Sequence, residues 1–156
     1  IYSNVANNNP PVSHMNLVNA ELAKISVNTF VTTKISYANM LGEICERIPG
    51  ADIDVVTNAI GQDSRIGRKY LKGATGYGGP CFPRDNVAFG KLAEAVGATF
   101  ALAAATDTVN RKQAARLVGH LLPHLAAGST VGILGLAYKP DTNVIEESQG
   151  VALAKE

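Results

Sequence analysis

A run of residues without helix breakers constrains this fold more than any other feature. Residues 16–48 contain no proline, and their single glycine is Gly42. They can therefore form one helix much longer than the average of about 11 to 12 residues. Its apolar residues lie on more than one face, so several faces must be covered. These residues are Leu17, Ile25, Val27, Val31, Ile35, Met40, Leu41 and Ile44.

The apolar faces of the long helix can be buried in two ways. The rest of the domain can wrap the long helix, or a second copy of the chain can pack on it. We expect the second, a homodimer formed through this helix, and burial within one chain stays open as the alternative. The 156 residues are enough for one domain with its own core and a piece of another.

Turn residues divide the rest of the helical region into shorter helices. Asp52 is a good N-cap residue, and a glycine or a proline stands near the end of each predicted helix. We therefore predict a mainly α fold. The predicted helices span residues 53–60, 84–96 and 99–125, within a helical central domain over residues 16–127 that follows a linker over residues 1–15.

Residues 128–156 have a different pattern. Residues 130–136 are β-branched and apolar, as in a buried parallel strand, and a loop and a helix opening at Glu147 follow them. Strand, loop and helix together are typical of the first β-α unit of a Rossmann-like α/β domain. Gly132 and Gly135 do not complete a GxGxxG fingerprint, so this unit alone does not indicate a dinucleotide site. Because the chain ends inside the predicted helix, we expect a piece of a longer protein.

A single thiol, that of Cys81, lies between a glycine-rich turn and the start of a helix. Pro83 suits the first helical position, and Asp85 suits the first turn. The unpaired N–H groups of a helix N-terminus favour the thiolate, which is the nucleophilic form. We therefore predict a reactive Cys81. A buried structural cysteine is the alternative, and Cys45, within an apolar run, has the pattern of that inert kind.

Composition excludes several classes of function. The formal net charge is +1, 17% of the residues are charged, and the basic residues form no run. We therefore expect no nucleic-acid surface and no membrane surface. The two cysteines lie far apart without a CxxC, which argues against a disulfide scaffold. No signal peptide or membrane-length apolar run is present, so we expect a cytoplasmic protein.

Two histidines, His120 and His124, lie one turn apart in a predicted helix. A protein metal site needs further ligands, and no third ligand accompanies them in the sequence. We therefore predict no metal site.

Lys24 and Asn28 lie one turn apart in the long helix and so share a face. Together they offer a cation and an amide donor, which could hold the oxygen of a carbonyl that a thiolate attacks. A solvated stripe is the alternative. The four cations between residues 65 and 72 have two similar interpretations, a solvated face or a contact with phosphate.

Four motifs, in their order along the chain, closely resemble the UDP-glucose/GDP-mannose dehydrogenase family. In that family an NAD-binding domain precedes a helical dimerisation domain, and a C-terminal domain binds the nucleotide of the sugar. The resemblance implies that this chain holds the helical domain and, over residues 128–156, the start of the UDP-binding domain. The motifs are AELAKISVNT at 20–29, DSRIG at 63–67, GYGGPCFPRD at 76–85 and GLAYKPDT at 135–142.

The resemblance implies an NAD-dependent oxidation of a nucleotide sugar at C6, from alcohol to carboxylate, in two successive hydride transfers. Cys81 matches the family nucleophile, which forms a thiohemiacetal and then a thioester. Lys24 and Asn28 match the pair that supports the oxyanion or a bound water. Asp85 matches the carboxylate that assists proton transfer and hydrolysis.

The resemblance also implies residues that bind the substrate and the cofactor. Arg65 matches an arginine that reaches the sugar nucleotide of the neighbouring subunit, and Lys139 matches a substrate-contacting lysine. The implied substrate contacts are Lys24, Asn28, Arg65, Tyr70, Lys72, Gly76, Tyr77, Gly78 and Lys139, and the residues beside the nicotinamide are Cys81, Phe82, Pro83 and Arg84.

The chain departs from the family pattern at two positions. Pro80 replaces a serine that many members have, which stiffens the turn without removing a catalytic group. Glu146 stands near the place of an arginine that contacts NAD in several relatives. The family's nucleotide fingerprint is not found in these residues, so we expect that this chain alone neither binds NAD well nor turns over.

Three functions remain open at the level of sequence. Phe82 after the cysteine favours UDP-glucose as the substrate, while GDP-mannose or another nucleotide sugar is the alternative within the same enzyme class. A non-catalytic dimerisation module with a structural Cys81 is the alternative from a different class.

Overall fold

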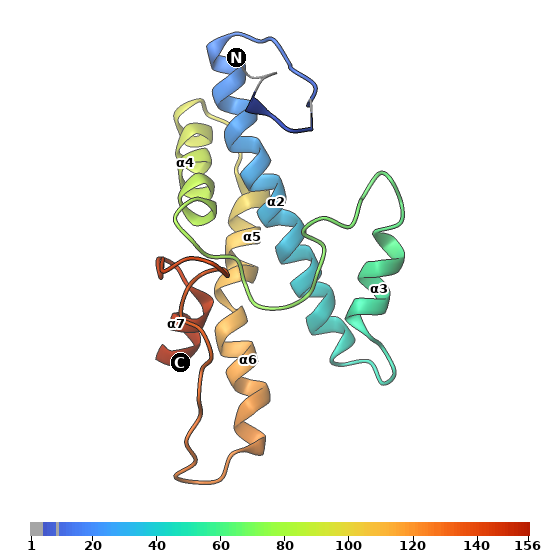
Figure 1. The fold of residues 1–156 in the computed structure, drawn as a ribbon, viewed down its shortest axis with the longest axis vertical. Coiled ribbons are helices and arrows are strands. Elements are labelled where there is room, and N and C mark those ends of the chain that lie inside the picture. Colours follow the sequence, from blue (N-terminus) through green and yellow to red (C-terminus); the bar gives the residue numbers. More distant parts are fainter. Residues whose placement is uncertain (1–4, 9) are drawn as a thin grey trace.

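A computed structural model describes residues 5–8 and 10–156. A long helix, α2, runs through the upper and middle parts of the molecule, and α4 and α5 pack against it (Figure 1). Helix α3 lies against the C-terminal half of α2, while α6 continues beyond α5 and carries α7 at its side. The elements are α2 (Leu17–Cys45), α3 (Ile53–Ile60), α4 (Phe82–Ala95), α5 (Ala101–Arg111), α6 (Gln113–Leu121), the 3₁₀ helix η1 (Leu122–His124) and α7 (Gln149–Lys155).

The predicted long helix is confirmed by α2. It begins after the N-cap Asn16, whose side chain accepts a hydrogen bond of 2.9 Å from the backbone N–H of Asn19. It ends at Cys45, three residues before the predicted end, and residues 46–48 form a turn instead. Pro49 accounts for this early end because it has no N–H to donate to the carbonyl of Cys45, four residues earlier, which instead accepts from Ile48 in a turn.

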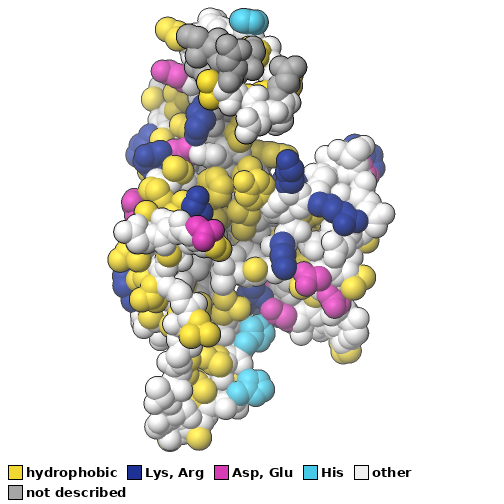
Figure 2. Space-filling view, viewed as in Figure 1, with side chains coloured by type: hydrophobic (Ala, Val, Ile, Leu, Met, Phe, Trp, Pro, Cys, Tyr) yellow, Lys and Arg dark blue, Asp and Glu magenta, His cyan; other side chains and the backbone are white. Residues whose placement is uncertain are grey.

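The side of α2 that packs against the rest of the chain is mostly small and polar. Thr32, Ala38 and Asn39 are fully buried, whereas Phe30 is 66% exposed and Tyr37 is 46% exposed. Hydrogen bonds hold the buried side, because the Thr32 hydroxyl lies 3.2 Å from the Asn86 side-chain oxygen on α4. Figure 2 shows hydrophobic side chains gathered on the surface over the middle of the molecule, where α2 runs. The chain alone therefore leaves much of the apolar surface of α2 uncovered.

The other helices differ from the predicted ones at their ends. Helix α4 begins at Phe82, two residues before the predicted start at Arg84. The helix predicted over 99–125 is divided at Lys112 into α5 and α6. At this break the Gln113 side chain donates to the Val109 carbonyl at 2.8 Å, the acceptor that a continuous helix would pair with the Gln113 N–H.

The strand predicted over residues 130–136 is wrong. These residues form a loop, in which Leu134 is fully exposed and Val131 is 46% exposed. The described residues contain no strand at all, so this segment has no neighbour with which to pair its backbone groups. The helix predicted after it is present as α7, which begins at Gln149 rather than at Glu147. The fold is therefore mainly α, and the predicted β-α unit is not formed.

The predicted N-terminal linker lies partly outside the described residues, at residues 1–4 and 9. Residues 10–16 belong to no helix or strand. Among the described helices, none combines the length and the apolarity that crossing a membrane requires.

Candidate active site

Cys81 occupies the N-cap position of α4, with its thiol free and exposed. The Cys81 carbonyl accepts a hydrogen bond of 2.8 Å from the N–H of Asp85, which lies one helical turn further on. Pro83 stands in the first turn of the helix, where its missing N–H costs no hydrogen bond. The predicted place of the thiol at a helix N-terminus is confirmed.

A cavity of about 360 Å³ opens beside Cys81. Its walls come from α2, from the loop before α4, from the start of α4 and from the loop that follows residues 130–136. Aromatic side chains form part of it, since the rings of Tyr70 and Tyr77 both meet Phe82 edge-on, with centroids 6.4 and 6.2 Å apart. The lining residues are Ile35, Tyr70, Gly76, Tyr77, Gly78, Pro80, Cys81, Phe82, Tyr138 and Lys139.

This cavity brings together most of the predicted substrate contacts. Lys139 comes from a loop far along the chain, and its ammonium lies 5.5 Å from the centroid of the Tyr138 ring. The cavity therefore offers a thiol, aromatic surface and one cation. That combination can hold a polar, partly anionic ligand against a nucleophile.

A cluster of polar side chains surrounds Asp85, one turn from Cys81. The Asp85 carboxylate accepts a hydrogen bond of 2.5 Å from the Asn28 amide and lies 3.3 Å from the Lys24 ammonium. The predicted shared face of Lys24 and Asn28 is confirmed, since both reach the same oxygen of Asp85. Neither side chain lines the cavity beside Cys81.

The charge of Asp85 is stabilised within this cluster. Only 6% of Asp85 is exposed, and burial alone would raise the pKa of its carboxyl group. Hydrogen bonds from Asn28, Lys24 and Arg84 outweigh burial and hold the pKa of Asp85 below its ordinary value. The site therefore contains an ionised carboxylate next to two donors at neutral pH.

Side chains that the sequence did not single out fix the glycine-rich loop. The Asn110 amide of α5 pairs with both backbone groups of Tyr77, accepting from its N–H at 2.7 Å and donating to its carbonyl at 3.0 Å. Earlier in the loop, the Asn39 amide of α2 does the same, accepting from Ala74 N–H at 2.8 Å and donating to the Thr75 carbonyl at 3.1 Å. The loop is thus hydrogen-bonded to two helices.

The glycines of this loop are required by close backbone approach. A methyl group at Gly78 would overlap the carbonyl oxygen of Glu147, and one at Gly79 would overlap the Tyr138 ring. Gly79 also has a φ of 82°, and its N–H donates to the Glu146 carbonyl at 3.0 Å. The glycine-rich motif therefore serves to seat the C-terminal segment against the loop.

A buried polar network lies behind the loop. The Tyr77 phenol donates to Asp107 of α5, and the Asn86 amide donates to the Tyr77 oxygen at 3.0 Å and to Asp107 at 2.9 Å. Burial and the Asp107 carboxylate both raise the pKa of Tyr77 far above its usual range. Tyr77 therefore stays neutral, and its ring is fixed between α4 and α5.

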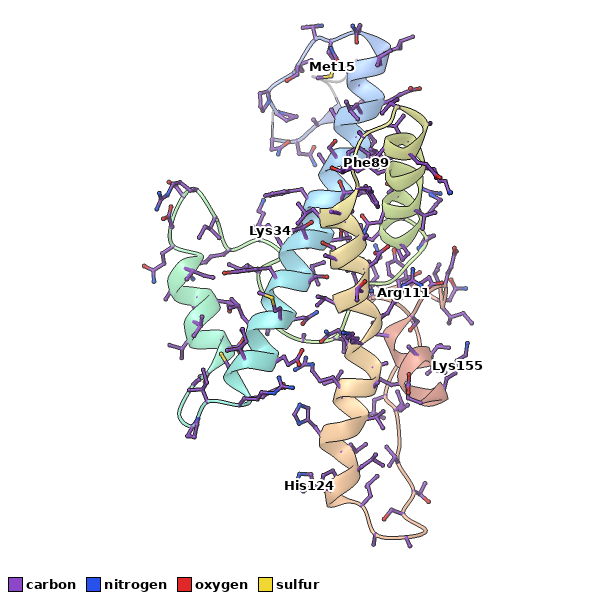
Figure 3. All side chains as sticks on the ribbon, turned by 180° about the vertical axis from the view of Figure 1, so that it is seen from behind. Met15, Lys34, Phe89, Arg111, His124 and Lys155 are labelled. Atoms are coloured by element: carbon purple, nitrogen blue, oxygen red, sulfur yellow. The ribbon has the colours of Figure 1, made fainter. Side chains whose placement is uncertain are left out.

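A second cavity, of about 540 Å³, shares Tyr77 and Pro80 with the first in its lining. The predicted cofactor contacts are divided between the two cavities, because Pro83 and Arg84 line this one while Cys81 and Phe82 line the first. Arg111, at the end of α5, also lines it, and Figure 3 shows this residue near the segment that leads into α7. Carboxylates of Asp107, Glu146 and Glu147 face the same space.

Two further predicted substrate residues, besides Lys24 and Asn28, lie outside the cavity beside Cys81. Lys72 is exposed and lines neither cavity. Arg65 forms an ion pair of 2.5 Å with Asp63, in a loop that the Lys34 ammonium ties to α2 by a hydrogen bond of 2.9 Å to the Ile66 carbonyl. Figure 3 labels Lys34 where α2 meets this loop. Arg65 lines a separate hollow of about 230 Å³, next to Phe30 and Tyr37 of α2.

The histidine pair is used in a different way from a metal site. His120 lies 2.9 Å from the Glu46 carboxylate at the end of α2, which Arg116 also contacts. Burial would raise the pKa of Glu46, but these two partners lower it below its ordinary value. In the part of the chain that the structure describes, no group of three potential metal ligands is found.

The functional residues that sequence reasoning missed are amides and a carboxylate within helices. In the sequence, nothing distinguishes these residues from ordinary polar positions of a helix or, for Gln149, of a helix start. They are Asn39, Asn86, Asp107, Asn110 and Gln149. A polar residue on the side of a helix that should face the core is the one signal that could have indicated them.

Comparison with known proteins gives consistent similarities. A sequence model described as the central domain of the UDP-glucose/GDP-mannose dehydrogenase family matches residues 18–112. The UDP-glucose 6-dehydrogenase TuaD of Bacillus subtilis is 44% identical over 140 residues, which cover 88% of this chain and 30% of that protein. The UDP-glucose 6-dehydrogenase AglM of Haloferax volcanii is 40% identical over 146 residues, covering 93% of this chain and 34% of that protein.

A solved structure has the same fold. The UDP-glucose dehydrogenase from the hyperthermophilic archaeon Pyrobaculum islandicum superimposes with a TM-score of 0.78 and 41% sequence identity, covering 88% of this chain and 32% of that one. The chain spans about a third of the length of the relatives that it matches.

Proposed function

The chain belongs to the UDP-glucose/GDP-mannose dehydrogenase family, and we propose that it supplies the central part of an NAD-dependent 6-dehydrogenase that oxidises UDP-glucose to UDP-glucuronate. The observation that carries the proposal is the convergence of Lys24 and Asn28 on Asp85, one helical turn from the exposed thiol of Cys81. The relatives named above, which act on UDP-glucose according to their names, support this choice of substrate.

Cys81 is the proposed nucleophile. After the C6 alcohol has lost a hydride and a proton, the thiolate adds to the aldehyde carbon, and the oxygen takes up a proton to give a thiohemiacetal. Loss of a second hydride and a proton gives a thioester. Water then forms a C–O bond as the C–S bond breaks, which returns the thiolate and releases a carboxylate and two protons.

The Asp85 cluster is proposed to serve the oxygen atoms in these steps. Asn28 can donate to an oxygen that becomes negative, and Lys24 can stabilise the same charge. Asp85, ionised and one turn from the thiol, can take a proton from the water that attacks the thioester. Its pairing with Lys24 and Asn28 holds all three groups in place before the substrate binds.

We assign the two cavities, which share Tyr77 and Pro80 in their linings, to the sugar nucleotide and the cofactor. The larger cavity is within the range that ligand sites occupy, and the guanidinium of Arg84 on its edge suits a phosphate or an amide oxygen. Pro83 and Arg84 would therefore hold NAD, with Cys81 and Phe82 on the facing side. When bound, NAD would supply the hydride acceptor, one molecule for each of the two hydride transfers.

A homodimer through α2 is part of the proposal. Phe30, Tyr37 and Ile44 lie seven residues apart, so they share one face of the helix, and each is at least 45% exposed. Arg65 lies at the edge of that face, in the hollow with Phe30 and Tyr37. A second copy packed there would meet Arg65, which accounts for its distance from Cys81 within one chain.

An activity assay with the complete protein tests the proposal. We expect NADH formation with UDP-glucose, at a higher kcat/KM than with GDP-mannose, and two NADH for each UDP-glucose consumed. Cys81→Ala should abolish the overall oxidation, while Cys45→Ala, which changes the other thiol, should retain it. A Cys81→Ala variant that still forms UDP-glucuronate would exclude the proposed nucleophile, and a preference for GDP-mannose would exclude the proposed substrate.

A further inference from the structure

We propose that Asn110 and Gln149 are positioning residues that hold the backbone of Tyr77 and, through it, the loop that presents Cys81. The inference rests on the proposed function, because it concerns the walls of that same site. It goes beyond the residues proposed to act on the reacting atoms, since neither amide lines the cavity beside Cys81; Asn110 lines the larger cavity, and Gln149 lines neither.

Among the residues that the structure describes, the hydrogen bonds to the Tyr77 backbone come from these two side chains. The Asn110 amide accepts from the Tyr77 N–H at 2.7 Å and donates to the Tyr77 carbonyl at 3.0 Å. The Gln149 amide donates to the same carbonyl at 3.1 Å. The two donors hold the peptide group between Tyr77 and Gly78, and the acceptor holds the one between Gly76 and Tyr77, so the backbone on both sides of Tyr77 has little freedom to rotate.

Gly76 is the residue that permits this arrangement. A methyl group there would lie 2.5 Å from the Asn110 oxygen and 2.7 Å from the Gln149 oxygen, closer than real contacts allow. Both amides can therefore reach Tyr77 only because position 76 has no side chain. The glycine and the two amides form one unit.

The two amides come from different parts of the chain. Asn110 is in the last turn of α5, within the helical domain, whereas Gln149 is the first residue of α7, in the C-terminal segment. Tyr77 lies between the two cavities and lines both of them. Movement of α7 would thus be transmitted to the wall of the site and to the loop that ends at Cys81.

The effect on rate can be large because reacting groups need accurate placement. A shift of about 1 Å in a catalytic group can cost about 100-fold in rate. Tyr77 precedes Cys81 by four residues, so a rotation of the peptide group between Tyr77 and Gly78 displaces the turn that carries the thiol. Loss of one donor should therefore reduce kcat more than it raises KM.

Two isosteric variants of the complete protein test the inference. Asn110→Asp and Gln149→Glu each keep the size of the side chain and remove its donor to the Tyr77 carbonyl. Thr108→Asp is the control, because it places the same charge on the same helix at an exposed residue whose hydroxyl donates to the Ala104 carbonyl instead. We measure kcat and KM with UDP-glucose, and the rate at which iodoacetamide alkylates Cys81 in the absence of sugar and NAD, below the melting temperature of each variant.

We expect kcat to fall by about 10- to 100-fold in both variants and the alkylation rate of Cys81 to change, with Thr108→Asp close to the parent. Because both amides bind one carbonyl, the double variant should lose less than the product of the two single losses. Parent-like kcat and alkylation in folded Asn110→Asp and Gln149→Glu would overturn the inference. If one of these variants does not fold, the kcat and the alkylation rate of the other variant test the inference.

The alkylation measurement separates this inference from the proposed function. A parent protein that oxidises no nucleotide sugar, but whose Cys81 alkylation changes in Asn110→Asp and Gln149→Glu, would remove the proposed function and support the positioning role. A parent that oxidises UDP-glucose, with unchanged kcat and Cys81 alkylation in both variants, would support the proposed function and remove the positioning role.

Discussion

Asp85 shows how much of this site depends on single side chains. It is a buried carboxylate at the start of α4, and three donors from two helices reach its oxygens. An isolated buried carboxylate would be protonated or would unfold the site. Lys24 and Asn28 therefore stabilise the charge, and in return the charge fixes both of these exposed or half-buried side chains near Cys81.

Replacing Asp85 should change the pH dependence of stability. The pKa of Asp85 in the folded protein is below its ordinary value, so the ionised group stabilises the fold above about pH 4. That stabilisation is lost as the pH falls through the lowered value. We expect the difference in the free energy of unfolding between the parent and Asp85→Asn to shrink from about pH 5 to about pH 3. Urea denaturation across this range measures it, and a difference that is constant with pH would contradict this assignment of charge.

At the scale of single residues, part of the site could be predicted. Cys81 at a helix start, and Lys24 and Asn28 on one face, follow from local patterns that one or two helical turns contain. The contacts of Asn110 and Gln149 with Tyr77 span 33 and 72 residues of sequence. No local sequence pattern indicates such partners, because an asparagine or glutamine side chain is equally common on a surface exposed to solvent.

At the scale of elements, α2 is organised differently from an ordinary amphipathic helix. Its buried positions include Thr29, Thr32, Ser36 and Asn39, while large apolar side chains such as Phe30 face outward. Small and polar residues allow α4, α5 and the loop before α4 to approach closely and to receive hydrogen bonds. The helix therefore acts as a frame for the site on one side and leaves its apolar side for another surface.

Asn39 should be one of the more costly residues to replace on this helix. Its side chain is fully buried and pairs with Ala74 N–H and the Thr75 carbonyl. Asn39→Ala leaves both backbone groups without that partner, so we expect the free energy of unfolding to fall by about 1 to 3 kcal/mol. Asn58→Ala, at an exposed position of α3, is the matched control and should change it by less than about 0.5 kcal/mol. An equal effect of the two changes in urea denaturation would show that the pairing is not stabilising.

The elements themselves were predicted unequally. The absence of proline over residues 16–48 was sufficient to predict α2, and turn residues predicted α3 and α4 to within two residues at their starts. The break at Lys112 was not predictable, because it depends on a side chain competing for a backbone acceptor. The prediction of a strand over residues 130–136 was wrong for a different reason. Its sequence suits a buried sheet, but the described residues provide no second strand.

At the scale of the whole molecule, the exposed apolar face of α2 is the feature that calls for a partner. Large exposed apolar patches mark interaction sites, and a helix with such a face is usually covered in the assembled protein. We propose a second copy of the chain as that cover. Arg65 would then complete the site of the neighbouring copy, as the resemblance to the family implies.

A charge on this face should prevent the assembly. Phe30 is 66% exposed, so Phe30→Glu should fold normally and shift the complete protein from dimer to monomer in sedimentation velocity. Val55→Glu adds the same charge at a residue of α3 that is 64% exposed, and it should leave the dimer intact. Both variants behaving as dimers would place the interface elsewhere.

The chain by itself should be inactive. The proposed NAD contacts in the larger cavity are only Pro83 and Arg84, both in the first turn of α4. We expect isothermal titration calorimetry of this chain with NAD to give no measurable heat, and no NADH to form with UDP-glucose. Turnover by these residues alone would show that they already contain the whole catalytic site.

The covalent role of Cys81 is tested most directly by mass spectrometry of the Asp85→Asn variant of the complete protein, quenched during turnover with UDP-glucose and NAD. Without the Asp85 carboxylate, hydrolysis of the thioester should slow, so we expect the peptide that contains Cys81 to carry the mass of the nucleotide-sugar acyl group. The peptide that contains Cys45 should remain unmodified. Formation of UDP-glucuronate with Cys81 unmodified throughout, and equally by Cys81→Ala, would contradict the account.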